Sequence, residues 1–226
     1  MPSPAPMYPV VLRTEGRRCL VVGGGPVAAR KAAELVRCGA IVTLVAPAVD
    51  PAIEALAETG AQGVLQVERR RYRENEAADY RLVVTATGLV EVDRQVATDA
   101  EAAGVWINSA DDAAHCTFIL PSVHRDGTVT IAVSTGGASP AMATWLRRRV
   151  GELLGDDLGT LAELIEEYRD QLMAEGRPTT AVDWAQLLDG PLPALVRDGD
   201  MAGARTLLTE AARLAGSPEL PEQSAG

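Results

Sequence analysis

A glycine-rich turn between an apolar run and a helix-forming segment constrains the fold of this chain more than any other feature. The run Arg18–Val22 stops at Gly23–Gly25, and a segment with helical spacing begins at Pro26. Gly23, Gly25 and Ala28 fill the pattern G-x-G-x-x-A. In this pattern Gly23 permits a tight turn, Gly25 admits a pyrophosphate, and Ala28 keeps helix and strand close. The stretch therefore predicts a dinucleotide site at a helix N-terminus.

Strand and helix patterns alternate after this turn. The β-branched run Ile41–Val45 is typical of a parallel strand that is buried on both faces. Further strands are expected over residues 64–67 and 80–88 and in the stretch 105–112, with helices over 51–59 and 92–103. This order predicts an α/β fold with a Rossmann-type, doubly wound parallel sheet. The charged run 68–74 suits a solvated edge better than an anion site, which is the alternative.

The second strand ends without the acidic residue that binds the ribose hydroxyls in many NAD sites. It continues as Ala46-Pro47-Ala48, and Asp50 lies beyond the proline turn, so this aspartate is a weak candidate for the ribose ligand. No arginine stands at the tip to bind a 2′-phosphate. These residues favour NAD over NADP only weakly.

The pattern changes after Thr117. Residues 118–122 and 128–134 are expected to form two strands of a hairpin-like addition, and Ser139 followed by Pro140 predicts the N-cap and first position of a helix. Helical segments are then expected over 140–154, 158–173, 182–188 and 201–215. Residues 216–226 have the composition of a disordered tail.

Charge and composition exclude several classes of function. A net charge of −10 and an aromatic content of 4% leave neither a basic surface nor a stacking platform for nucleic acid. No apolar run approaches the roughly twenty residues of a membrane helix, and residues 1–9 lack a secretory pattern, so we expect a cytoplasmic protein without a membrane partner. Cys19, Cys38 and Cys116 have no ligand-like spacing, so no metal site is predicted.

Six stretches, in order along the chain, resemble the precorrin-2 dehydrogenase module of the siroheme synthases. They are residues 23–31, 45–47, 85–87, 108–111, 118–122 and 132–140. The resemblance implies an oxidoreductase that uses NAD to oxidise precorrin-2, a tetrapyrrole, to sirohydrochlorin in siroheme (porphyrin) biosynthesis. In some members ferrous iron insertion, a ferrochelatase (lyase) activity, follows. The region after Leu172 resembles the family only loosely, which bears on that second activity.

The resemblance also implies a homodimer whose interface is built largely by the segment after the nucleotide domain. We therefore expect an NAD-binding Rossmann domain over residues 1–113, a dimerisation segment of strands and a helix over 114–150, and a helical C-terminal domain with a disordered tail over 151–226. The chain given lacks the methyltransferase domain fused to the module in some members, so its precorrin-2 is expected to be made elsewhere.

The resemblance and the glycine pattern together give the expected ligands of NAD. These residues are Gly23, Gly24, Gly25, Pro26, Val27, Ala28, Ala46, Pro47, Ala48, Ala86 and Thr87.

Asp111 falls on the catalytic aspartate of the family. Oxidation of precorrin-2 removes a hydride and a proton, and a carboxylate at the carboxyl end of a strand is placed to take the proton. A turn cap is the alternative role for Asp111 and the expected role for Asp112. His115 is a weaker acid–base candidate, and Thr135 stands where some members carry a phosphorylated serine.

The substrate is a polycarboxylate, so an acidic protein must gather local donors for it. Hydroxyls and backbone N–H groups ahead of a helix can bind a carboxylate, although a simple helix cap is an equal alternative. The expected substrate-binding residues are Asn108, Ser134, Thr135, Gly136, Gly137 and Ser139. Basic candidates are Arg13, Arg30, Lys31, His124, Arg125 and Arg147–Arg149.

Three other functions remain open at this point. The protein could be a dehydrogenase without chelatase activity, a non-catalytic regulatory module that senses NAD, or an unrelated small-molecule reductase on the same fold. Turnover of precorrin-2 separates the first from the other two.

Overall fold

The computed structural model describes residues 6–59 and 63–215. The chain divides into two compact units, the first comprising Met1–Leu120 with Gly136–Ala138 and the second Pro121–Thr135 with Ser139–Gly226. The predicted disordered tail, residues 216–226, lies outside the described residues.

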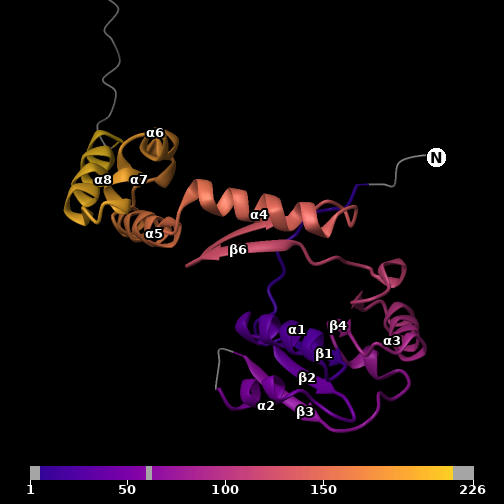
Figure 1. Ribbon diagram of the computed structural model, residues 1–226. Coiled ribbons are helices and arrows are strands. Elements are labelled where there is room, and N and C mark those ends of the chain that lie inside the picture. Colours follow the sequence, from indigo (N-terminus) through magenta and orange to yellow (C-terminus); the bar gives the residue numbers. More distant parts are fainter. Residues whose placement is uncertain (1–5, 60–62, 216–226) are drawn as a thin grey trace, which may run out of the picture. The chain divides into compact units, whose positions relative to one another are not determined.

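A five-stranded parallel sheet with the order β3-β2-β1-β4-β5 forms the centre of the first unit (Figure 1). The chain crosses from one side of β1 to the other after β3, which makes the carboxyl ends of β1 and β4 the switch point where ligands bind in such sheets. The predicted Rossmann-type α/β fold is confirmed. The strands are β1 Arg18–Val22, β2 Ile41–Val45, β3 Val64–Glu68, β4 Leu82–Thr85 and β5 Trp106–Ser109.

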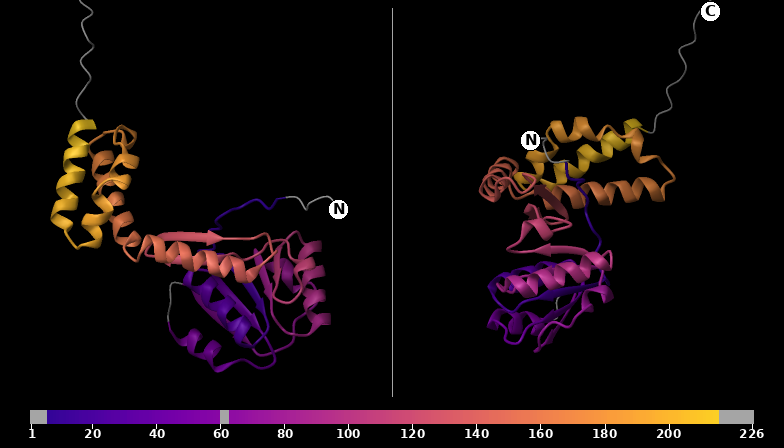
Figure 2. Two further views of the ribbon diagram at one scale, coloured as in Figure 1. Left: turned by 45° about the horizontal axis from the view of Figure 1, so that its top comes forward. Right: turned by 90° about the vertical axis from the view of Figure 1, so that its right-hand side faces the viewer.

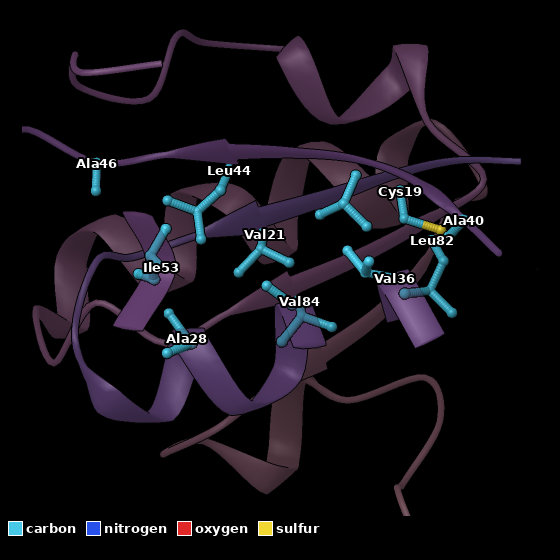
Figure 3. Close-up of a cluster of buried hydrophobic side chains, with 13 residues drawn as sticks. Cys19, Val21, Ala28, Val36, Ala40, Leu44, Ala46, Ile53, Leu82 and Val84 are labelled. Carbon is cyan, nitrogen blue, oxygen red and sulfur yellow. The ribbon is translucent and has the colours of Figure 1, made fainter. Parts of the chain in front are cut away.

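Helices cover both faces of the sheet because the strand residues alternate between two apolar clusters. Cys19 and Val21 face the cluster that contains Ala28 of α1 and Ile53 of α2 (Figure 3). Leu20 and Val22 face α3 on the other side of the sheet. The helices are α1 Pro26–Arg37, α2 Pro51–Glu58 and α3 Val90–Ala102, with 3₁₀ turns at Glu76–Asp79 and Ala113–His115.

The second unit begins with an antiparallel hairpin of β6 (Ser122–Asp126) and β7 (Val129–Val133), followed by helix α4 (Pro140–Leu154). The hairpin was expected, but its first strand lies after residue 122 rather than over 118–122. The N–H of Phe118 instead donates to the carbonyl of Ile107, and its ring packs against the sheet core. These contacts hold residues 117–118 in the first unit.

The remaining helices of the second unit pack around a core of their own (Figure 2). Leu164, Leu192 and Leu208 are buried in it. The sequence predicted three of these four helices and missed α7. None of the helices within the described residues is long and apolar enough to cross a membrane. They are α5 Leu158–Ala174, α6 Trp184–Asp189, α7 Leu192–Arg197 and α8 Met201–Ala215, with a 3₁₀ turn at Thr179–Ala181.

Candidate dinucleotide site

The three glycines after β1 have three different environments. Gly23 has φ +130°, and a Cβ there would lie under 3.0 Å from the carbonyl of Ala86. A Cβ on Gly24 would lie closer still to the carbonyl of Ala48. A Cβ on Gly25 would meet no protein atom within 4 Å. The first two glycines are therefore required by packing within the protein, whereas the third faces open space that fits the pyrophosphate of a dinucleotide.

The start of α1 adds unpaired donors beside that space. Pro26 occupies the first turn, and the first intrahelical bond runs from the N–H of Ala29 to the carbonyl of Gly25. The N–H groups of Val27 and Ala28 precede it and so have no acceptor within the helix. Ala28 is fully buried, as the close packing of helix and strand requires, and Val27 is exposed. Such a helix start favours an anion.

The tip of β2 packs directly on the glycine turn. The N–H of Asp50 donates to the carbonyl of Gly24 at 2.7 Å, while the Asp50 carboxylate caps α2 by accepting from the N–H of Ala52 at 2.9 Å. Ala46 is buried, and Pro47 and Ala48 are exposed beside the turn. Asp50 therefore serves as an N-cap in this structure, which accounts for its position beyond the proline turn.

Two of the four arginines after β3, Arg69 and Arg70, pair with carboxylates. Arg70 hydrogen-bonds Glu68 at 2.6 Å and forms a bidentate pair with Glu76. Burial alone would raise the pKa of the Glu76 carboxyl, but its hydrogen bonds, those from Arg70 first among them, together outweigh burial and the pKa is lowered. The bond to Glu76 likewise raises the pKa of Arg70 against the effect of burial. Arg69 pairs with Glu54. The solvated-edge interpretation of this run fits these pairs better than an anion site does.

A buried polar cluster lies where β4 ends. Asp93 of α3 accepts hydrogen bonds from the Thr85 hydroxyl, from the Thr87 N–H at 3.2 Å and from the Thr87 hydroxyl at 2.8 Å. The Thr87 hydroxyl also accepts from the N–H of Leu89 at 3.0 Å. The side chain of Thr87 is thus engaged within the protein, so this residue and Ala86 border the glycine turn with their backbone.

Asn108 and Cys116 connect β5 to the segment that follows it. The Asn108 amide donates to the carbonyl of Phe118 at 3.1 Å and to the Cys116 sulfur at 3.6 Å, which also accepts from the N–H of Ser109. Asn108 therefore shapes the loop that carries Asp111.

Lys31 of α1 is half-buried. Burial lowers the pKa of its ammonium group, the neighbouring arginine lowers it further, and the Cys116 sulfur acts in the opposite direction.

The two aspartates after β5 have different environments. The N–H of Ala110 donates to the carbonyl of Thr85 at 2.9 Å, which continues the β4–β5 ladder and brings Asp111 out at the carboxyl edge of the sheet. Asp111 is exposed, and its carboxylate has no hydrogen-bond or ion-pair partner among the residues that the structure describes. Asp112 accepts from the N–H of Ala114 and pairs with His115 at 2.8 Å, which confirms it as a cap.

The hydroxyls of the loop before α4 form a helix cap. Ser139 accepts from the N–H of Met142, and the Thr135 hydroxyl bonds both the N–H and the carbonyl of Ser139. Gly136 and Gly137 have positive φ values of 63° and 87° and open space at the Cβ position. The predicted cap is confirmed, and the substrate role of Ser134–Ser139 stays a prediction.

Carboxylate, histidine and cysteine side chains do not gather in groups of three that could hold a metal ion within residues 6–59 and 63–215. The Asp93 cluster was not predicted from the sequence. Its signal in the sequence is the pair of threonines around Ala86, followed by an aspartate in the first turn of the next helix.

The glycine turn, the helix start and the sheet order define the class of the first unit: it is a Rossmann-type dinucleotide-binding domain. A family profile described as "Putative NAD(P)-binding" matches residues 10–122, and one described as "Sirohaem biosynthesis protein central" matches residues 126–153. The chain belongs to the siroheme synthase family, of which it carries the NAD-binding module.

Similar proteins agree with this assignment. The siroheme synthase of Chromobacterium violaceum is 38% identical over 200 residues, which are 88% of this chain and 42% of that protein. The siroheme synthase of Methylococcus capsulatus is 35% identical over 216 residues, 94% of this chain and 45% of that protein. The chain thus spans less than half of the length of these relatives. The precorrin-2 dehydrogenase SirC shares the fold, with a TM-score of 0.66 and 24% identity over 92% of this chain and 98% of that one.

Proposed function

We propose that this protein oxidises precorrin-2 to sirohydrochlorin with NAD as the hydride acceptor. The observation that carries the proposal is the unpaired Asp111 carboxylate at the carboxyl edge of the sheet. One strand away, Ala86 packs against the glycine turn. A base and a dinucleotide site at one edge are what a reaction that removes a hydride and a proton requires.

NAD, when bound, supplies the hydride acceptor; the protein supplies binding, orientation and the proton acceptor. The open space at Gly25 and the free N–H groups of Val27 and Ala28 would hold the pyrophosphate. Asp111 takes the proton that the substrate loses when its hydride leaves. Its exposure keeps the carboxylate accessible to a large substrate.

The charge pairs near the tip of β2 support NAD rather than NADP. A 2′-phosphate needs a cation that is not already paired, and Arg70 is held by Glu68 and Glu76. NAD should therefore be the better acceptor, although β2 carries no acid for the ribose hydroxyls.

The proposal is tested by mixing the protein with precorrin-2 and NAD under anaerobic conditions and following NADH absorbance. We expect NADH to form, Asp111→Ala to abolish its formation, and NADH affinity to stay within about twofold of wild type. Asp112→Ala is the matched control, because it removes the adjacent carboxylate, which caps a turn and pairs with His115. Wild-type protein that forms no NADH would refute the dehydrogenase function, and an active Asp111→Ala variant would refute the role of Asp111.

Ferrous iron insertion and a homodimer are the finer parts of the proposal, and both come from the family resemblance. Exposed apolar side chains on α4 support a self-association surface: Met142 and Trp145 are half exposed and Leu153 is 82% exposed. Light scattering after gel filtration should give twice the mass of the chain, and a monomer would exclude this part. Adding Fe²⁺ to sirohydrochlorin and the protein should give the metallated spectrum faster than without the protein.

A further inference from the structure

Asp93 is a buried carboxylate that the proposed reaction does not use. It is 5% exposed and lies in the first turn of α3, where the helix dipole favours a negative charge. Its hydrogen-bond donors all come from Thr85 and Thr87, and no cationic side chain pairs with it among the described residues. Burying a charge without a cation is costly, so this arrangement calls for a reason beyond stability.

The hydrogen bond from the Thr87 N–H to Asp93 connects this carboxylate with the dinucleotide site. The peptide that joins Ala86 to Thr87 packs closely against Gly23, since a Cβ on Gly23 would fall under 3.0 Å from the Ala86 carbonyl and 3.2 Å from the Thr87 nitrogen. The N–H of that same peptide donates to Asp93. The Ala86 N–H is fixed from the other side by the carbonyl of Val22, at 2.8 Å.

The hydroxyl of Thr87 also links Asp93 to the start of α3. It donates to Asp93 and accepts from the N–H of Leu89, which is the N-cap residue and has no side-chain cap of its own. One carboxylate oxygen, Oδ1 of Asp93, therefore fixes the whole turn from the end of β4 to the start of α3.

We infer that Asp93 is a positioning residue for the dinucleotide: it holds the Ala86–Thr87 peptide against the glycine turn, and so fixes one wall of the site. Asp93 does not touch the reacting atoms and acts through Thr87. The inference rests on the proposed function in that NAD is taken as the ligand of this site.

Asp99 on the same helix provides a matched control. It is also buried, at 6% exposed, and also accepts three hydrogen bonds, from the hydroxyl of Tyr72, the N–H of Asn75 and the amide of Gln95. Its donors belong to the loop after β3 and to α3 itself rather than to the end of β4. Asp99→Ala should therefore cost similar stability without altering the dinucleotide site.

The experiment measures NADH affinity by fluorescence titration and thermal stability for the full chain and its variants. We expect Asp93→Ala to raise the Kd for NADH by about tenfold or more, the change that corresponds to one lost charge-assisted hydrogen bond. Asp99→Ala should lower the melting temperature comparably and leave the Kd within about twofold. In Asp93→Asn the side-chain carbonyl can still accept from the Thr87 N–H, so it should restore most of the affinity.

Thr87→Val keeps the shape of the side chain and removes its hydroxyl, so it tests the same link if Asp93→Ala does not fold. It should raise the Kd for NADH by several-fold. Equal affinities for wild type, Asp93→Ala and Thr87→Val, or equal losses in Asp93→Ala and Asp99→Ala, would overturn the inference while leaving the proposed function intact. Wild-type protein that does not bind NADH would instead overturn the proposed function and, with it, this role.

Discussion

Alanine substitutions at Gly24 and Gly25 should separate the needs of the fold from the needs of the ligand. A methyl group on Gly24 would lie under 3.0 Å from the Ala48 carbonyl and 2.9 Å from the Ala46 Cβ. Overpacking of this kind costs about 1–3 kcal/mol. We expect the upper end of that range for Gly24→Ala, because a backbone carbonyl cannot move as a flexible side chain can.

Gly25→Ala should have the opposite profile. Its φ of −87° is ordinary for alanine, and the added Cβ would meet no protein atom. The free energy of unfolding should therefore fall by only about 0.5–1 kcal/mol, because alanine is a poorer N-cap residue than glycine. The same methyl group fills the space expected for the pyrophosphate. Losing that close approach should weaken NADH binding by about 2 kcal/mol or more, which is roughly 30-fold.

Urea unfolding and NADH titration of both variants give the two quantities independently. Gly24→Ala should be the less stable protein, and Gly25→Ala should be the poorer NADH binder of the two when both are compared in the folded state. If Gly25→Ala binds NADH as tightly as the wild type, the open space at Gly25 is not the pyrophosphate site and the reasoning fails.

Three further predictions concern other parts of the molecule. Burial raises the pKa of the Cys19 thiol from 9.0 to about 11. Between these pH values the unfolded chain loses the thiol proton while the folded protein keeps it, so the free energy of unfolding should fall by about 2–3 kcal/mol as the pH rises from 9 to 11. Urea unfolding of Cys19→Ala should not show this loss. Glu76→Gln weakens the clamp on Arg70, so kcat/KM for NADP should rise relative to NAD, and an unchanged ratio would exclude Arg70 from cofactor choice. Tyr168→Phe removes two part-buried hydrogen bonds, to the Arg205 carbonyl and the Thr209 hydroxyl, and should cost the helical cluster about 1–2 kcal/mol in urea unfolding, with NADH affinity unchanged.

Local patterns were sufficient to predict the sheet. Ile41–Val45 forms β2 over the predicted residues because a β-branched run between turn residues has few alternatives. The hairpin was misplaced for a tertiary reason: Phe118 has a strand-like sequence, but its backbone pairs with Ile107 and Asn108 of the first unit. Sequence periodicity does not show that these contacts with the first unit compete with strand formation.

The site was predictable to a similar extent. The glycine pattern identified the turn, but it gave the central glycine no packing role, and Gly24 has the tightest surroundings of the three because of a loop some twenty residues later in the chain. Asp93 was overlooked because an aspartate in the first turn of a helix looks like an ordinary complement to the helix dipole. Only the fold brings it to Thr85 and Thr87.

The acid-free tip of β2 follows from how the glycine turn is supported. The segment after β2 lies directly on the turn, with the Asp50 N–H bonded to the Gly24 carbonyl and the Ala48 carbonyl against Gly24 itself. Small residues at Ala46 and Ala48 permit this approach, and a larger acidic side chain there would have to find space beside the turn. The acid of this segment is used to cap α2 instead. The second wall of the turn, from Ala86, is held by Asp93, so two loops clamp the glycines from opposite sides, and the open space at Gly25 is what they leave for the ligand.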